Sequence, residues 1–115
     1  MIKIALIVLT LLHGLIHLMG GLNELGIAKI EGVARTLYPL SPTVKMGLGV
    51  IWLIALALFL GAAYGLITNK AWWQPVIVAA VAVSQILIIL WWPDAKFGTI
   101  ANILIVALMF LYKRR

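Results

Sequence analysis

The chain contains no cysteine, and only three of its 115 residues are acidic. The absence of cysteine excludes disulfide bonds, thiolate metal sites and anchoring through a lipidated cysteine. Charged residues make up 10% of the sequence and hydrophobic residues 65%, whereas soluble domains average about 25% charged and about 45–50% apolar residues. This composition excludes an ordinary soluble domain.

The net charge of +6 does not indicate a nucleic-acid-binding protein. The basic residues stand singly at the ends of apolar segments, apart from the C-terminal cluster Lys113-Arg114-Arg115. Single basic residues and a terminal basic cluster are typical of anchoring at a membrane surface. The sequence therefore predicts the lipid bilayer as a partner, and no nucleic acid.

Four uncharged runs lie between the charged residues, at positions 4–23, 46–69, 71–93 and 97–112. A bilayer core about 30 Å thick is crossed by roughly 20 helical residues. The runs predict an all-α integral membrane protein, a four-helix bundle that forms one domain over residues 1–115. Its helices are expected over about 2–22, 43–67, 71–92 and 94–112.

The loop over residues 23–45 contains a helical pattern of its own. Apolar residues recur in it at Ile30, Val33, Ala34 and Leu37. This spacing predicts a short amphipathic helix that lies in the membrane interface between the first two spans. Glu31 and Arg35 are four positions apart and are expected to form an ion pair on it.

The basic residues also predict the orientation of the chain. One side would carry five of them, including the C-terminal cluster, and the other side four basic residues with all three acidic ones. Cytoplasmic loops are enriched in Lys and Arg. We therefore expect a multi-pass membrane protein with both termini in the cytoplasm.

Small residues predict where helices approach closely. Ala57, Gly61 and Gly65 follow one another at four-residue spacing on the second span, and Ala80 and Ser84 do so on the third. Stripes of this kind usually serve helix packing in membranes.

A few polar residues interrupt the apolar segments. His13 and His17 are four apart and share one face of the first helix. The topology brings His17 into the same half of the bilayer as Gln85, Asp94, Lys96, Thr99 and Asn102, whereas His13 is nearer the middle. Intramembrane polar residues usually face the interior of a bundle or a cavity. We expect a polar pocket lined by His13, His17, Gln85 and Asn102.

This pocket has several possible roles. It would bind a small lipophilic ligand, or it would be structural, with neutral histidines hydrogen-bonded to Gln85 and Asn102. Two histidines at i, i+4 also suit a divalent metal, which would need a further ligand such as Asp94 or Glu24. One histidine would serve as an axial ligand of a haem, with the second ligand from another chain or copy.

The two charged residues before the fourth helix have simpler interpretations. Asp94 is expected to cap that helix at its N-terminus, and Lys96 to anchor it at the interface. A role of both at the mouth of a cavity is the alternative. A histidine and Asp94 would also form an acid–base pair, although no motif in the sequence positions a substrate.

Several stretches together resemble a known group of proteins. They are His13-Gly-Leu-Ile-His-Leu-Met-Gly, Leu40-Ser41-Pro42, Ser84-Gln85 and Asp94-Ala-Lys-Phe-Gly-Thr-Ile-Ala-Asn102. They are similar to those of small bacterial four-helix membrane proteins grouped with the DoxX-like families. The resemblance implies a four-helix bundle in the bacterial inner membrane and raises the hypothesis of an accessory subunit of a respiratory or photosynthetic redox complex. Self-association and a membrane enzyme acting on isoprenoid- or sterol-like lipids are the remaining alternatives.

Overall fold

The computed structural model describes residues 1–30 and 35–113, and over these ranges the chain is helical without any strand. The helices are α1 (Ile2–Glu24), α2 (Pro42–Ile67), α3 (Trp73–Leu90), α4 (Trp92–Ala95) and α5 (Gly98–Lys113). The prediction of an all-α fold is confirmed. By length and composition α1, α2 and α3 are able to cross a membrane, and α5 is a shorter apolar helix.

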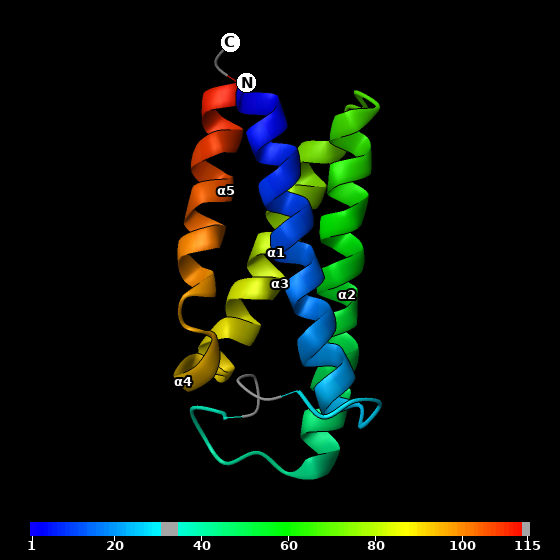
Figure 1. Ribbon diagram of the computed structural model, residues 1–115, viewed down its shortest axis with the longest axis vertical. Helices are drawn as coiled ribbons and strands as arrows, with labels where there is room; N and C mark the ends of the chain where they lie inside the picture. The colour runs from blue at the N-terminus through cyan, green and yellow to red at the C-terminus, as the bar shows by residue number, and fades with distance from the viewer. Residues whose placement is uncertain (31–34, 114–115) are drawn as a thin grey trace.

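The four long helices lie side by side along the long axis of the molecule (Figure 1), which measures 46 × 21 × 20 Å. The start of α1 and the end of α5 lie at the same end of the molecule. At that end Lys3 Nζ donates a hydrogen bond of 2.6 Å to Asn69 Oδ1 in the turn between α2 and α3. The loop after α1 and the short α4 lie at the opposite end.

The predicted fourth helix is divided in two. Asp94 lies inside the single turn of α4, and α5 begins four residues later at Gly98. The expectation that Asp94 caps the fourth helix is therefore wrong. Its backbone N–H donates to the carbonyl of Trp91, as it does within a helical turn, and its carboxylate is held by Arg35.

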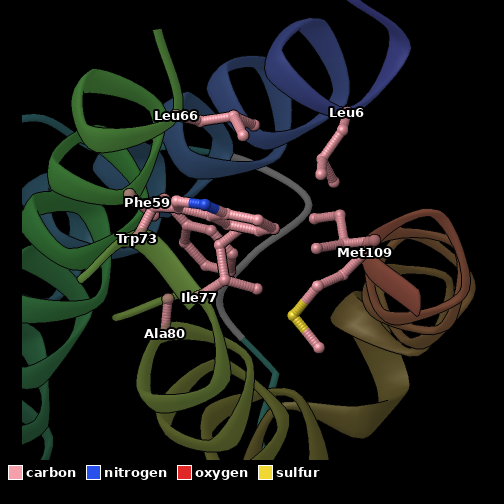
Figure 2. Close-up of a cluster of buried hydrophobic side chains, with 9 residues drawn as sticks. Leu6, Phe59, Leu66, Trp73, Ile77, Ala80 and Met109 are labelled. Atoms are coloured by element: carbon pink, nitrogen blue, oxygen red, sulfur yellow. The ribbon is translucent and has the colours of Figure 1, made fainter. Parts of the chain in front are cut away.

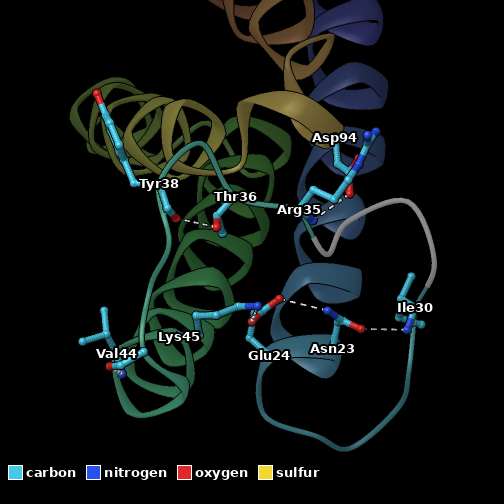
Figure 3. Close-up of polar contacts among 10 residues, drawn as sticks. Asn23, Glu24, Ile30, Arg35, Thr36, Tyr38, Val44, Lys45 and Asp94 are labelled. Atoms are coloured by element: carbon cyan, nitrogen blue, oxygen red, sulfur yellow. Dashed lines mark hydrogen bonds and ion pairs between the residues drawn. The ribbon is translucent and has the colours of Figure 1, made fainter.

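The predicted interfacial helix is absent from the described part of the loop. Residues 31–34, at the centre of the expected helix, lie outside the described residues. The expected Glu31–Arg35 pair therefore lies outside them as well. Ile30 and residues 35–37, on either side, are not helical. Their backbone N–H groups donate to distant acceptors instead of to the fourth residue before them. Ile30 donates to Asn23 Oδ1 and Arg35 to Asp94 Oδ2 (Figure 3). Leu37 donates to the carbonyl of Leu90.

Glycines on one face of α1 allow α2 to approach closely. A Cβ atom on Gly14 would lie 2.7 Å from Cβ of Phe59, and a Cβ on Gly20 would overlap the ring of Trp52. Backbones that approach this closely increase van der Waals contact between helices. The close approach places the rings of Phe59 and Trp52 directly against the histidine face of α1.

The core between the long helices is apolar at the end that carries the termini. One cluster of buried residues joins all four long helices and consists of Leu6, Phe59, Ala62, Leu66, Trp73, Ile77, Ala80, Ile105 and Met109 (Figure 2). The outer surface is also apolar, with large exposed side chains on every long helix, such as Leu12, Ile54, Ile86 and Phe110. Soluble monomers rarely expose contiguous apolar surface on this scale.

Candidate functional site

His13 and His17 lie on the buried face of α1. This face recurs at helical spacing and consists of Leu6, Thr10, His13, Gly14, His17, Gly20 and Gly21. His13 and His17 are 3% and 1% exposed. Buried polar side chains of this kind require hydrogen-bond partners.

The partners of the histidines come from α3 and α5. His17 Nε2 lies 2.7 Å from Ser84 Oγ, and His13 Nε2 lies 2.8 Å from Asn102 Oδ1. Asn102 Nδ2 donates to Ser84 Oγ at 3.2 Å and to Gln85 Oε1 at 3.0 Å. One connected set of hydrogen bonds thus ties α1, α3 and α5 together.

Thr99 and Gln85 form the outer part of this hydrogen-bond set. Gln85 Nε2 donates to Thr99 Oγ1 at 3.0 Å. Both side chains are partly exposed, and together with Asn102 they line a shallow groove between α3 and α5 on the outer surface. Gln85 reaches the histidines only through Asn102.

Ser84 is the residue that sequence reasoning assigned to helix packing. It is fully buried and contacts both His17 and Asn102. Its position in the sequence indicates that it belongs to the site. Ser84 precedes Gln85 and lies one helical turn after Ala80, on the buried face of α3 that also carries Ile77 and Leu87.

Aromatic rings from α2 surround the two histidines. The ring centroids of His13 and His17 lie 5.2 and 5.1 Å from that of Phe59, and His17 lies 5.4 Å from Trp52. Trp52 in turn packs edge-on against Trp91 at 5.4 Å. The ring of each histidine is therefore held in place on several sides, because aromatic contacts add to its hydrogen bonds.

A cavity of about 280 Å³ adjoins the histidines on the side of α5. Its walls are formed by His13, Ile16, His17, Trp52, Ile88, Asp94, Ala95, Phe97, Gly98 and Ala101. Ile16 and Phe97 are exposed on the outer surface, Phe97 to 72%. The cavity therefore has a polar floor and an apolar mouth between α1 and the start of α5.

Asp94 closes the loop end of the cavity. Its side chain is 5% exposed, while that of Arg35, its partner, is 75% exposed. Arg35 Nε donates to Asp94 Oδ1 at 2.6 Å, and the Arg35 backbone N–H donates to Oδ2 at 2.8 Å (Figure 3). The pair ties the loop to α4 beside the cavity. Lys96 does not line the cavity and lies over the ring of the exposed Phe97.

The donor set does not fit a divalent metal bound by both histidines. Both ring nitrogens of His17 are engaged, Nδ1 with the backbone carbonyl of His13 and Nε2 with Ser84. Across residues 1–30 and 35–113 no three His, Asp or Glu side chains gather at one point. His13 Nδ1 has no hydrogen-bond partner there and would serve at most one axial position of a haem.

The contact of Ser84 with His17 resembles a nucleophile and its base. Ser84 Oγ is nevertheless fully buried and does not line the cavity. A substrate in the cavity would therefore meet the histidines and Trp52, and would not meet the hydroxyl. The geometry favours binding over nucleophilic catalysis.

Comparison of this chain with known protein families, with curated proteins and with solved structures gives no match.

Proposed function

We propose that this chain is an integral membrane protein of the bacterial inner membrane, in which α1, α2, α3 and α5 form a four-helix bundle that crosses the bilayer. The apolar outer surface of these helices supports the proposal. So does the placement of charged residues, which lie at the two ends of the 46 Å long axis. With four crossings both termini lie on one side, and the basic C-terminus favours the cytoplasm.

Within this bundle, the cavity beside His13 and His17 is proposed to bind a small lipophilic molecule. The observation that carries the proposal is the combination of a histidine floor with an apolar mouth on the outer surface of the bundle. Ligand pockets are typically apolar with a small number of placed polar groups. A mouth between Ile16 and Phe97 opens toward the acyl chains, so that a ligand enters from the bilayer and not from water.

A matched pair of substitutions on α5 tests this function. Ala101 lines the cavity, whereas Ala107 is exposed on the outer face of the same helix. Ala101→Leu adds three carbon atoms inside the cavity, and Ala107→Leu adds the same atoms on the outside. Both variants and the unaltered protein are purified from native membranes in mild detergent, and their bound small molecules are extracted and quantified by mass spectrometry.

We expect one small lipophilic compound to accompany the unaltered protein and Ala107→Leu, and to be depleted at least about tenfold in Ala101→Leu, since Leu occupies its space. Equal amounts in all three proteins, or no bound compound in any of them, would overturn the proposal. Thermal unfolding in the same detergent checks that Ala101→Leu is folded.

A second candidate is an accessory transmembrane subunit of a larger redox complex, as the DoxX-like resemblance implies. The outer face of α2 favours it, because a Cβ atom on Gly47 or on Gly61 would meet nothing within 4 Å. Small residues on an outer face permit close approach of a helix from another chain. Native mass spectrometry separates the candidates: other polypeptides that co-purify in fixed ratio indicate a subunit, and multiples of 12.6 kDa indicate self-association.

A further inference from the structure

The hydrogen bonds around His17 determine which of its nitrogens carries hydrogen. Nδ1 of His17 lies 2.8 Å from the backbone carbonyl of His13, which only accepts. In the neutral ring Nδ1 is therefore the donor and Nε2 the acceptor. Ser84 must then donate its single hydroxyl hydrogen to Nε2, at 2.7 Å.

The same reasoning continues to His13. Because Ser84 has used its hydrogen, its oxygen accepts from Asn102 Nδ2, which orients the amide of Asn102 with Oδ1 toward His13. Oδ1 only accepts, so His13 Nε2 carries the hydrogen of their 2.8 Å contact. In the neutral ring, Nδ1 of His13 is then an acceptor. The two histidines are in opposite tautomers.

The ring of His13 lines the cavity and lies against the start of α5. Its atom Cε1, which is bonded to both ring nitrogens, lies 3.5 Å from the position that a Cβ on Gly98 would take, and Gly98 also lines the cavity. Nδ1 is buried and has no hydrogen-bond partner in the described part of the chain. A residue that lines the cavity therefore carries one unused acceptor.

Trp52, which also lines the cavity, carries an unused donor. Its indole Nε1–H is buried and, within residues 1–30 and 35–113, has no hydrogen-bond partner. Indole nitrogen only donates. A hydroxyl group combines the donor that His13 requires with the acceptor that Trp52 requires, whereas a ketone or an ether supplies the acceptor alone.

The volume and walls of the cavity limit the rest of the ligand. An apolar cavity of about 150 Å³ holds benzene, so about 280 Å³ holds one substituted ring. Trp52 and Phe97 present ring surfaces, and such surfaces favour a planar partner. A longer apolar tail would extend through the mouth between Ile16 and Phe97 into the bilayer.

We propose that the ligand is a neutral lipophile with a hydroxyl group on a single ring, and that this hydroxyl donates to His13 Nδ1 and accepts from Trp52 Nε1. The inference rests on the proposed binding function and names its ligand class. Its head is a phenol-type or a cyclohexanol-type ring, and the tail is apolar.

Four compounds of nearly equal size test the ligand class. 4-Butylphenol donates and accepts, 4-butylanisole only accepts, butylbenzene does neither, and 4-butylcyclohexanol has the hydroxyl on a ring that is not planar. Each compound is titrated into the protein in detergent micelles, and its affinity is measured from the shifts of the indole N–H signals. We expect the phenol to bind about tenfold more tightly than the anisole, as about one hydrogen bond predicts.

Two tryptophan substitutions provide matched controls. Trp52→Phe removes the indole donor in the cavity, whereas Trp92→Phe removes one that does not line it. Trp52→Phe is expected to weaken the phenol and the anisole severalfold and to leave butylbenzene unchanged. Trp92→Phe is expected to change none of them.

The tautomers are measured without any substitution, because the chain contains only two histidines. Long-range ¹⁵N–¹H spectra of labelled protein are expected to show one ring protonated at Nε2 and the other at Nδ1. Addition of 4-butylphenol is expected to shift the unprotonated nitrogen of His13 and to leave His17 unchanged. Equal tautomers for both rings would overturn the inference.

The outcomes separate the ligand class from the binding function. If the four compounds bind equally well, a lipophile is bound but the hydroxyl does not matter, and the inference fails while the proposed function stands. If none of them binds and Ala101→Leu changes nothing, both fail. If the phenol or the cyclohexanol exceeds the anisole, the inference is supported, and their ratio tells whether the ring is planar.

Discussion

Ser84 Oγ lies within hydrogen-bonding distance of His17 Nε2, at 2.7 Å, and this buried contact joins α3 to α1. Ser84→Ala would leave a buried acceptor without a donor. We expect it to lower the free energy of unfolding by about 1–2 kcal/mol, toward the upper range of hydrogen bonds within membrane bundles. Reversible unfolding in mixed detergent micelles measures the change.

A hydroxyl outside the bundle interior provides the control for Ser84. Thr68 Oγ1 donates to the carbonyl of Tyr64 at an exposed helix end. Thr68→Val removes that hydroxyl where solvent replaces it, so its effect is expected to stay within about 0.5 kcal/mol. Equal losses for the two variants would contradict a special contribution of Ser84.

The glycines of α1 are predicted to be required for packing. In Gly14→Ala the new methyl group would lie 2.7 Å from Cβ of Phe59, an atom close to the backbone that cannot turn away. Overpacking of this kind costs about 1–3 kcal/mol, and α1 and α2 must separate to relieve it. Loss of stability in the same unfolding assay checks the prediction.

Gly61→Ala is the matched control, because a Cβ atom at Gly61 would meet nothing within 4 Å. Ala is the better helix former by about 1 kcal/mol, so this variant is expected to be at least as stable as the unaltered protein. A loss in Gly61→Ala as large as that in Gly14→Ala would show that glycine content, and not helix contact, decides the result.

Hydropathy alone predicted the main helices closely. The helix expected at 2–22 spans Ile2–Glu24, and the helix expected at 43–67 spans Pro42–Ile67. The agreement is close because long uncharged runs leave little freedom in where such helices end. The depth argument placed His13 and Asn102 in the same region, and they are in direct contact. This argument works because antiparallel helices fix which segments share a depth.

The contact between the loop and α4 could not be predicted. Arg35 and Asp94 are 59 positions apart, and the sequence offered each a local role, one in an amphipathic helix and one as a helix cap. The small-residue stripe on α2 was also ambiguous. Gly65 packs against Trp72 and Trp73, whereas Gly61 faces outward. The closest approaches are instead at glycines of α1, namely Gly14, Gly20 and Gly21.

The pair between Arg35 and Asp94 is predicted to hold the loop against α4. Arg35→Gln removes the charged contact, and the loop is expected to become several times more sensitive to limited proteolysis in detergent. The effect on the free energy of unfolding is expected to stay below about 1 kcal/mol, since the arginine side chain is 75% exposed and exposed pairs contribute little.

Lys29→Gln serves as the control for Arg35→Gln. It removes one positive charge from the same loop, at an exposed position. If both variants are cleaved at the same rate, the charge of the loop and not the pair with Asp94 determines its protection. High salt is expected to weaken protection in the unaltered protein and to have little further effect on Arg35→Gln.

The two ends of the molecule are expected to lie on opposite sides of the membrane. Tyr38 is 64% exposed at the loop end, and Lys70 is exposed at the opposite end, in the turn between α2 and α3. The chain has no cysteine, so Tyr38→Cys and Lys70→Cys each introduce a single thiol. A membrane-impermeant thiol reagent is applied to intact cells, or to spheroplasts where an outer membrane blocks it. We expect it to label Tyr38→Cys alone, because a helix about 40 Å long separates the two ends. Labelling of Lys70→Cys alone would reverse the orientation, and labelling of both from outside would contradict a bundle that crosses the membrane.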